Sequence, residues 1–227
     1  MRCPLCSCTD LEIYSDSPQG DLTSAAIGSS RREIGCGQIL RCKQCRLGFR
    51  ASRVDEQSLA RLYADLDIDI YQSELRGRQA TANRHLGIIR RYSRPSRLLD
   101  IGCASGMFLR RAAADGWSVV GVEPSQQLSR LAKENLDGRG EIIPTTLQTA
   151  SLTGAAFDVV TMWDVLEHVP EPAEFLRTAA SLLRPGGHLF VNVPDLDSLQ
   201  ARLLGARWPL LLPEHLNYFN RGSLDGV

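Results

Sequence analysis

The sequence predicts an α/β protein with a doubly wound, mostly parallel, Rossmann-like sheet, preceded by a small cysteine-rich module. From Arg97 onward, apolar strand-like runs alternate with helix-like segments, a pattern typical of parallel sheets covered by helices. Six of the seven cysteines lie before residue 46, which sets the start of the chain apart. The 227 residues are enough for one α/β domain and a small module, so we expect two domains.

The charge balance excludes a generally basic protein. The chain has 26 Lys and Arg residues against 26 Asp and Glu residues, so no overall charge attracts it to nucleic acid or to an anionic membrane. No apolar run approaches the roughly 18 residues that a membrane span needs, and the first residues lack the apolar core of a signal peptide. We therefore expect a cytoplasmic protein with a small-molecule substrate.

Four of the early cysteines form two C-x-x-C pairs, "CPLC" (Cys3, Cys6) and "CKQC" (Cys42, Cys45). Two such loops can present four thiolates to one tetrahedral Zn²⁺ ion, and a site closed by four protein ligands is structural. Cysteines in the cytoplasm stay reduced, which favours a metal over disulfides. The sequence thus predicts a zinc-ribbon-like module over residues 1–52, held by Cys3, Cys6, Cys42 and Cys45.

The 35 residues between the two pairs exceed the usual spacing. They include "SPQGDLTSAAIGSS", which indicates a loop between two short ribbon strands. Cys8 and Cys36 belong to neither pair; each is either an alternative ligand or a small apolar residue that packs in the interior.

Residues 53–96 form a helical linker in this interpretation. Between Glu56 and Tyr92, apolar residues recur at helical spacing on two faces; they are Leu59, Leu62 and Tyr63, and later Leu86 and Ile89 with Ile88 beside them.

The third segment, residues 97–227, carries the alternating pattern. We expect its helices to begin near Ser105, Ser125 and Glu171. The expected strands are continuous apolar runs, as in sheets buried on both faces; they are "RLLDIG", "SVVGVE", "EIIP", "FDVVTMW" and "HLFVNVP".

The turn after the first of these strands predicts a ligand held against the backbone. Gly102, Ala104 and Gly106 carry little or no side chain, and parallel sheets bind ligands beyond the carboxyl ends of their strands. Glu123 ends the next strand, 21 residues after Gly102, where an acid can accept hydrogen bonds from ribose hydroxyls. A dinucleotide fingerprint would need glycines where Ala104 and Met107 stand, which disfavours a nicotinamide cofactor.

Four motifs follow one another along the chain: "LLDIGCASGMFL", "VVGVEPS", "FDVVTMWDVLEHVPEP" and "LLRPGGHLFVNVPD". In this order they resemble the motifs of class I S-adenosylmethionine-dependent methyltransferases, and the resemblance covers about Leu98 to Phe219. The tail "WPLLLPEHLNYFN" is similar to a subgroup that methylates small molecules and sugars, some of whose members carry a Cys-rich N-terminal segment.

The resemblance implies S-adenosylmethionine as the cofactor and assigns its binding residues. It places Asp100, Gly102, Ala104 and Gly106 around the methionine part and Glu123 on the ribose. The segment after the third strand lacks the usual acid near the adenine, which leaves Leu147 and Gln148 as candidates there. Trp163 and Asp164 would close the pocket on the substrate side, although Asp164 could instead cap a helix.

A hydroxyl acceptor needs a base, and His168 and His215 are the candidates. His168 lies beyond the fourth strand beside Glu167, which could orient its ring; a structural role is the alternative. His215 lies among Trp208, Tyr218 and Phe219, which either line a substrate pocket or pack in a core. We expect His85 to be a surface residue, His188 to lie at the far end of the fifth strand, and Cys103 to be a packing residue.

The predicted function is methyl transfer, with oxygen the expected acceptor atom, to a small molecule or sugar. One alternative is an RNA or protein methyltransferase that uses the zinc module for recognition, although the chain has no basic, aromatic-laced stripe. Another is a non-catalytic cofactor-binding module.

The end of the chain carries a last expectation. Members of the resembled family continue with a helix and a β-hairpin whose last strand covers the fifth strand, whereas this sequence stops at "FNRGSLDGV". We therefore expect a C-terminally shortened domain whose fifth strand is an exposed edge, covered by a second copy in a homodimer or by another chain.

Overall fold

The structure, a computed structural model, describes residues 1–16, 37–52 and 75–225. The chain divides into two compact units. We call the first the cysteine unit; it comprises the described parts of Met1–Leu62, Asp164–Leu176 and Asn192–Val227. The second, the parallel-sheet unit, comprises the described parts of Tyr63–Trp163 and Arg177–Val191.

The predicted Rossmann-like sheet is confirmed. Its strand order is β6-β5-β4-β7-β8, and β4 pairs in parallel with both β5 and β7, as β5 does with β6. The chain therefore winds outward from β4 in two directions, and the carboxyl ends of the parallel neighbours β4 and β5 lie at the same edge of the sheet. The strands are β4 (Arg97–Ile101), β5 (Ser118–Val122), β6 (Gly140–Ile143), β7 (Phe157–Trp163) and β8 (Leu183–Asn192).

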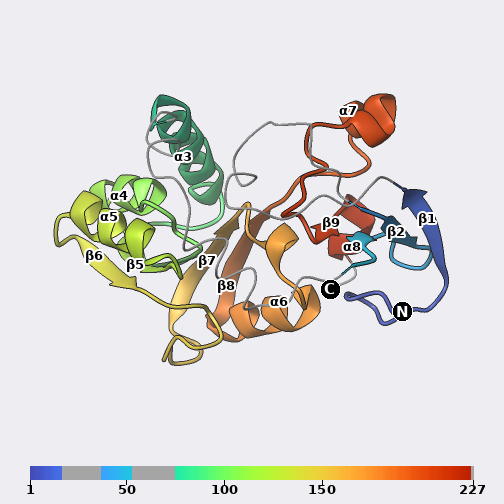
Figure 1. Cartoon of the computed structure of the whole chain (residues 1–227). Helices are drawn as coiled ribbons and strands as arrows, with labels where there is room; N and C mark the ends of the chain where they lie inside the picture. The colour runs from blue at the N-terminus through green and yellow to red at the C-terminus, as the bar shows by residue number, and fades with distance from the viewer. Residues whose placement is uncertain (17–36, 53–74, 226–227) are drawn as a thin grey trace. The chain divides into compact units, whose positions relative to one another are not determined.

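Helices connect these strands as the alternating pattern predicts. α5 begins after Ser125, whose hydroxyl accepts a hydrogen bond from Leu128 N at 3.3 Å and so caps the helix. α4 packs against α3, α5 and β5 (Figure 1), and a buried apolar cluster joins these helices to the sheet. The helices are α3 (Leu75–Ile89), α4 (Met107–Ala114), α5 (Gln126–Leu136) and α6 (Pro172–Ser181).

The linker is described only in part. Leu59, Leu62 and Tyr63 lie outside the described residues. In α3, Leu86 and Ile89 are buried, as their spacing indicates, whereas Ile88 is exposed. Among the described residues, no helix is both long enough and apolar enough to cross a membrane.

The fifth strand begins earlier than predicted. We expected it to start at His188, after the "PGG" turn, but β8 already begins at Leu183. Gly186 takes a left-handed φ of 79°, and a Cβ on Gly187 would lie 3.0 Å from the carbonyl oxygen of Asp158. The two glycines thus let the backbone stay close to β7 through the turn. β8 ends the strand order, and no described strand lies on its other side.

The cysteine unit contains a second sheet, in the order β1-β2-β3-β9 with all neighbours antiparallel. Its strands are β1 (Leu11–Ser15), β2 (Ile39–Cys42), β3 (Gly48–Arg50) and β9 (Asn217–Tyr218). The sequence predicted short ribbon strands but not β9, which comes from the other end of the chain. A Cβ on Gly48 would lie 2.8 Å from Leu196 Cδ2 and 3.2 Å from Tyr218 Cβ, so glycine permits this pairing.

Short helices complete the cysteine unit. They are the 3₁₀ helices η2 (Leu166–His168) and η3 (Gly205–Arg207) and the α-helices α7 (Leu199–Leu204) and α8 (Arg221–Asp225).

Candidate functional site

The turn after β4 holds its backbone in an unusual conformation. Gly102, Ala104 and Gly106 all have left-handed φ angles, of 71°, 49° and 72°. Gly102 N and Cys103 N both donate to Val122 O, at 2.8 and 3.1 Å, so the turn is tied to the end of β5. A Cβ on Gly106 would lie 3.1 Å from both the Cα and the Cβ of Ala132 in α5. Glycine is therefore required at 106, whereas Ala104 adopts a conformation that glycine adopts more easily.

Cys103 is a packing residue in the described structure, as expected. Its side chain is 5% exposed and belongs to the core of the parallel-sheet unit. A Cβ on Gly121 would lie 2.6 Å from Cys103 Sγ, so the thiol occupies the space that glycine leaves on β5. Burial raises the pKa of this thiol well above its ordinary value, which makes it a poor nucleophile.

Glu123 lies at the end of β5, fixed by the turn beside it. Its Oε2 accepts from Ala104 N at 2.9 Å and its Oε1 from Ser125 N at 2.8 Å. Burial raises its pKa, while these two backbone donors act in the opposite direction. Each carboxylate oxygen can accept more than one hydrogen bond. The carboxylate is thus rigidly placed and still able to bind hydroxyl donors.

Asp100, at the end of β4, is 2% exposed. The pKa of Asp100 is raised to about 7, mainly by burial. A hydrogen bond from Thr161 acts to lower this pKa, and the charge of Glu123 acts to raise it. Thr161 Oγ1 donates to Asp100 Oδ1 at 2.6 Å. The sequence interpretation did not identify Thr161, although its position inside the apolar run of β7 marks it as a buried polar residue.

Aromatic rings surround the end of β7. The ring of His85 stacks on Trp163, with centroids 3.8 Å apart and an interplanar angle of 16°, and Phe108 approaches Trp163 edge-on at 5.4 Å. The prediction that His85 is simply a surface residue is therefore wrong: α3 carries its ring onto the indole. The Trp163 indole N–H and the Ser105 hydroxyl are both buried without a hydrogen-bond partner among the described residues.

The other predicted cofactor residues differ in exposure. Leu147 is buried and Gln148 is exposed. Asp164 is also exposed and takes a left-handed φ of 56°, with its Oδ1 accepting from Asn192 Nδ2 at 2.6 Å. The residue that caps the N-terminus of a helix usually has an extended backbone, which Asp164 does not have. The residue at the N-cap position of η2 is Val165. The alternative of Asp164 as a helix cap is thus wrong.

The cysteine unit brings His168 and His215 together. Their ring centroids are 4.8 Å apart in an edge-to-face arrangement. His168 Nδ1 donates to Glu214 O and His215 Nδ1 to Leu210 O, each at 3.0 Å. Because a carbonyl can only accept, these bonds place the proton on Nδ1 and leave Nε2 as the acceptor atom of each ring.

Burial sets the charge of both rings. It lowers the pKa of His168 to about 4 and that of His215 to about 3, the latter helped by its histidine neighbour. Glu167 lies within 4.8 Å of both rings, and burial raises its pKa to about 8. Both imidazoles are therefore neutral near pH 7. The Glu214 carbonyl fixes the tautomer of His168, a role that the sequence interpretation gave to the Glu167 side chain.

The aromatic residues near His215 form a core. Trp208 and Tyr218 are buried together with Ile39, Leu196 and Ala201, and Phe219 is fully buried. The core alternative is therefore confirmed for these three aromatic residues.

The four predicted zinc ligands converge. The Sγ atoms of Cys3, Cys6, Cys42 and Cys45 all lie within 4.8 Å of one another. Cys3 Sγ lies 3.5 Å from Cys45 Sγ, and Cys6 Sγ lies 3.6 Å from Cys42 Sγ. These distances exclude disulfides, whose sulfurs are about 2.05 Å apart. They approach the edge of about 3.8 Å that a tetrahedron with Zn–S bonds of about 2.3 Å requires.

Both cysteine pairs share one backbone geometry. Ser7 N donates to Cys3 O and Arg46 N to Cys42 O, each at 2.9 Å. Ser7 and Arg46, each directly after the second cysteine of its pair, have left-handed φ angles of 62° and 64°. The two loops thus turn identically and present equivalent sulfurs. Cys8 lies outside this group, with its Sγ 3.4 Å from Asp10 N, and Cys36 lies outside the described residues.

Curated proteins with similar sequences are O-methyltransferases by name. The chain is 35% identical over 145 residues to the ubiquinone biosynthesis O-methyltransferase of Caulobacter vibrioides, covering 56% of this chain and 58% of that protein. It is 36% identical over 113 residues to the protein of the same name from Parvibaculum lavamentivorans, and this match covers 47% of this chain and 45% of that protein. The match thus spans about half the length of these relatives.

Solved structures show the same fold. A SAM-dependent methyltransferase from Thermotoga maritima superposes with a TM-score of 0.56 at 21% identity, covering 70% of this chain and 73% of that one. A complex of DhpI with SAH superposes with a TM-score of 0.53 at 19% identity, and the match covers 62% of this chain and 70% of that one.

The family comparison covers most of the parallel-sheet unit and continues beyond it. Residues 71–227 match a family described as "Methyltransferase domain". With its strand order, its left-handed turn after β4 and its buried acid after β5, the chain belongs to the methyltransferase domain family.

Proposed function

We propose that this chain binds S-adenosylmethionine in the parallel-sheet unit and transfers its methyl group to an oxygen atom of a small molecule. The family supports methyl transfer, and the names of the curated relatives support oxygen as the acceptor atom. S-adenosylmethionine, when bound, supplies a methyl group on a positively charged sulfur.

One observation carries the proposal. The Glu123 carboxylate is held by Ala104 N and Ser125 N at the edge where β4 and β5 end. A buried carboxylate fixed by two donors does not have to be reoriented when a ribose binds, so little ordering entropy is lost. The same edge carries the left-handed turn, over which a ligand can lie against the backbone.

The remaining residues fit the other parts of the cofactor. Asp100, Gly102, Ala104 and Gly106 would surround the methionine part, and an ionised Asp100 suits its ammonium group. The pKa of about 7 means that Asp100 must lose a proton before it can form this pair near neutral pH. Leu147 would pack on the adenine with Gln148 at its rim, while Trp163 and Asp164 would border the substrate side.

The base belongs to the cysteine unit in this proposal. His168 and His215 each offer a neutral Nε2 that can accept the proton of a hydroxyl acceptor. Their low pKa values make both weak bases in the described state. The contribution of a base is therefore smaller than that of positioning, which carries most of the rate in methyl transfer from an activated donor.

We also propose that one structural Zn²⁺ ion is bound by Cys3, Cys6, Cys42 and Cys45. Its support is the converging sulfurs and the identical turns of the two loops. All four ligands come from the protein, so the ion has no open position for substrate and would stabilise the fold only.

Radiolabelled S-adenosylmethionine tests the function. The protein would be incubated with fractions of small molecules, RNA and protein, and methylated products identified. Label in small-molecule ethers or esters supports the proposal, whereas label only in RNA or protein contradicts the acceptor class. A His168→Asn, His215→Asn variant that retains cofactor affinity but loses transfer would support the assignment of the base. Unchanged transfer in that variant would remove both histidines from catalysis.

A further inference from the structure

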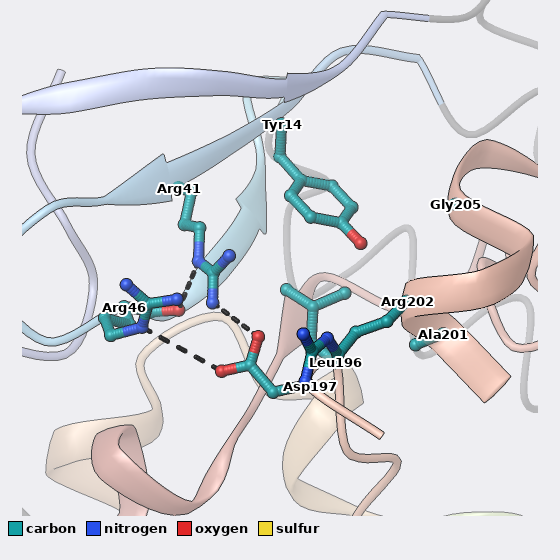
Figure 2. Close-up of a pocket in the computed structure, with 8 residues that line it drawn as sticks. All are labelled: Tyr14, Arg41, Arg46, Leu196, Asp197, Ala201, Arg202 and Gly205. Carbon is teal, nitrogen blue, oxygen red and sulfur yellow. Dashed lines mark hydrogen bonds and ion pairs between the residues drawn. The ribbon is translucent and has the colours of Figure 1, made fainter. Parts of the chain in front are cut away.

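A cavity in the cysteine unit has no part in the methyl-transfer proposal. Its volume is about 580 Å³, within the range of about 300–1,000 Å³ that is typical of small-molecule sites. It is bordered by β1, β2, the second cysteine loop, and the segment that leads into α7 (Figure 2). The lining residues are Tyr14, Arg41, Arg46, Leu196, Asp197, Ala201, Arg202 and Gly205.

The cavity has a local excess of positive charge. Among the residues that the structure describes, three guanidinium groups border it, against the single carboxylate of Asp197. The whole chain is formally neutral, so this surplus of two positive charges is a property of the cavity and not of a generally basic surface. The surplus matches the charge of a dianion.

Asp197 forms a close ion pair with one of the arginines and a long one with another. Arg41 Nη2 lies 2.6 Å from Asp197 Oδ1, and Arg46 Nε lies 3.9 Å from Asp197 Oδ2. Arg41 Nε also donates to Arg46 O at 3.4 Å. Only 13% of the Arg41 side chain is exposed, and Figure 2 shows its other terminal nitrogen pointing away from Asp197, to the side of the cavity where Tyr14 lies. Asp197 thus orients Arg41 and leaves it donors for a ligand.

Arg202 provides a third group that Asp197 does not bind. It projects from α7 toward the same space (Figure 2). It is exposed, and no ion pair joins its side chain to another described residue. Its charge is therefore available to a ligand without the loss of an internal pair.

The other walls of the cavity suit an organic group. Leu196 is buried against Ile39, Ala201 and Trp208, and Tyr14 packs against the same cluster. The Tyr14 hydroxyl makes no hydrogen bond to a described residue and points into the space between the strands and α7 (Figure 2). A planar guanidinium fork fits phosphate oxygens in pairs, and a phosphate alone would leave much of the volume unfilled. We infer that the cavity is a binding site for a phosphate-bearing small molecule.

Isothermal titration calorimetry at low ionic strength tests this inference. The probes are inorganic phosphate, pyrophosphate, uridine diphosphate and, as a dianion without phosphorus, succinate. We expect pyrophosphate and uridine diphosphate to bind, with affinities that fall as salt is added. Arg202→Gln should weaken both about tenfold, since it removes charge-assisted hydrogen bonds. Arg41→Lys should weaken both as well, because it keeps the charge but loses the fork.

Arg130→Gln is the matched control, because Arg130 is an exposed residue of α5 outside the cavity. It should leave the affinities unchanged, and circular dichroism should show that all variants are folded. The inference is wrong if no phosphate probe binds, if succinate binds as tightly as pyrophosphate, or if Arg202→Gln and Arg130→Gln bind equally. It does not rest on the proposed function, so a failure of methyl transfer leaves it intact.

Discussion

The two units of this chain are stabilised by different means. In the parallel-sheet unit, α4 links β4 to β5 and α5 links β5 to β6, and a large apolar cluster of described residues packs between sheet and helices. The cysteine unit gathers three separate segments, and the apolar cluster found among its described residues is smaller. It also buries polar atoms that have no hydrogen-bond partner among the described residues; they include Arg50 Nε and Nη2 and Glu167 Oε2.

This difference indicates where each unit is vulnerable. A large apolar core tolerates the loss of one polar contact but not a change of volume. A small sheet with buried polar groups depends on cross-links and on the protonation of those groups. Perturbations of metal binding and of pH should therefore act first on the cysteine unit, and perturbations of packing on the parallel-sheet unit.

Removal of the metal should have the largest effect. We expect Cys42→Ser to abolish zinc binding and to unfold the β1-β2-β3-β9 sheet, since the binding energy of a structural zinc site is folding energy, on the order of 10 kcal/mol. Elemental analysis measures the zinc, and hydrogen exchange locates the loss of protection. Cys8→Ser is the control and should keep one zinc per chain. Full zinc content in Cys42→Ser would exclude the four-cysteine site.

Acid should destabilise the cysteine unit through its histidines. Their folded pKa values, about 4 and about 3, lie below the ordinary value of 6.5. Their contribution to stability is therefore complete above pH 6.5 and is lost as pH falls toward 4, because the unfolded chain binds protons that the folded chain excludes. The slope is up to about 1.4 kcal/mol per pH unit for each histidine.

A double variant isolates this contribution. In His168→Asn, His215→Asn, the asparagine amides can donate to the same carbonyl groups but do not titrate. Between pH 7 and 4.5, the free energy of unfolding measured with urea should fall less steeply in this variant than in the wild type. Glu167 is present in both proteins, so its titration does not distinguish them. Parallel declines would show that the two histidines titrate normally in the folded chain.

Packing should be the sensitive feature of the parallel-sheet unit. Gly121→Ala places a Cβ 2.6 Å from both Cys103 Sγ and Leu109 Cδ1, and we expect a loss of about 1–3 kcal/mol from overpacking. Gly87→Ala in α3 meets nothing within 4 Å and should stabilise the protein by about 0.5–1 kcal/mol, because alanine favours helix. Urea unfolding compares the two. Equal effects would contradict the close approach of the turn to β5.

The sequence predicted the parallel-sheet unit well because its signals are local. Apolar runs, the small residues of the turn and the capping Ser125 each depend on a few neighbouring residues, and β4 to β7 lie within a residue or two of the predicted positions. The start of β8 was wrong because a Pro-Gly-Gly sequence usually ends a strand. Here the strand continues through the two glycines, and a Cβ on Gly187 would lie 3.0 Å from Asp158 O, an approach that the local sequence does not reveal.

The site was predictable only in part for the same reason. The spacing of the cysteines predicts the group that the structure brings together. No local pattern pairs β3 with β9, stacks His85 on Trp163, or brings Arg202 to the cavity that Arg41 and Arg46 line. These arrangements depend on contacts between residues far apart in sequence, and periodicity carries no information about them.

Calorimetric titration with S-adenosylmethionine tests whether the cofactor binds beside Glu123; it compares the wild type, Glu123→Gln and the exposed control Glu134→Gln. We expect the wild type and Glu134→Gln to bind equally. Glu123→Gln should lose about 1–3 kcal/mol of binding free energy, because its carboxylate would accept charge-assisted hydrogen bonds from the ribose. Undetectable binding by the wild type, or equal affinity in all three proteins, would contradict the placement of the cofactor at the edge where β4 and β5 end.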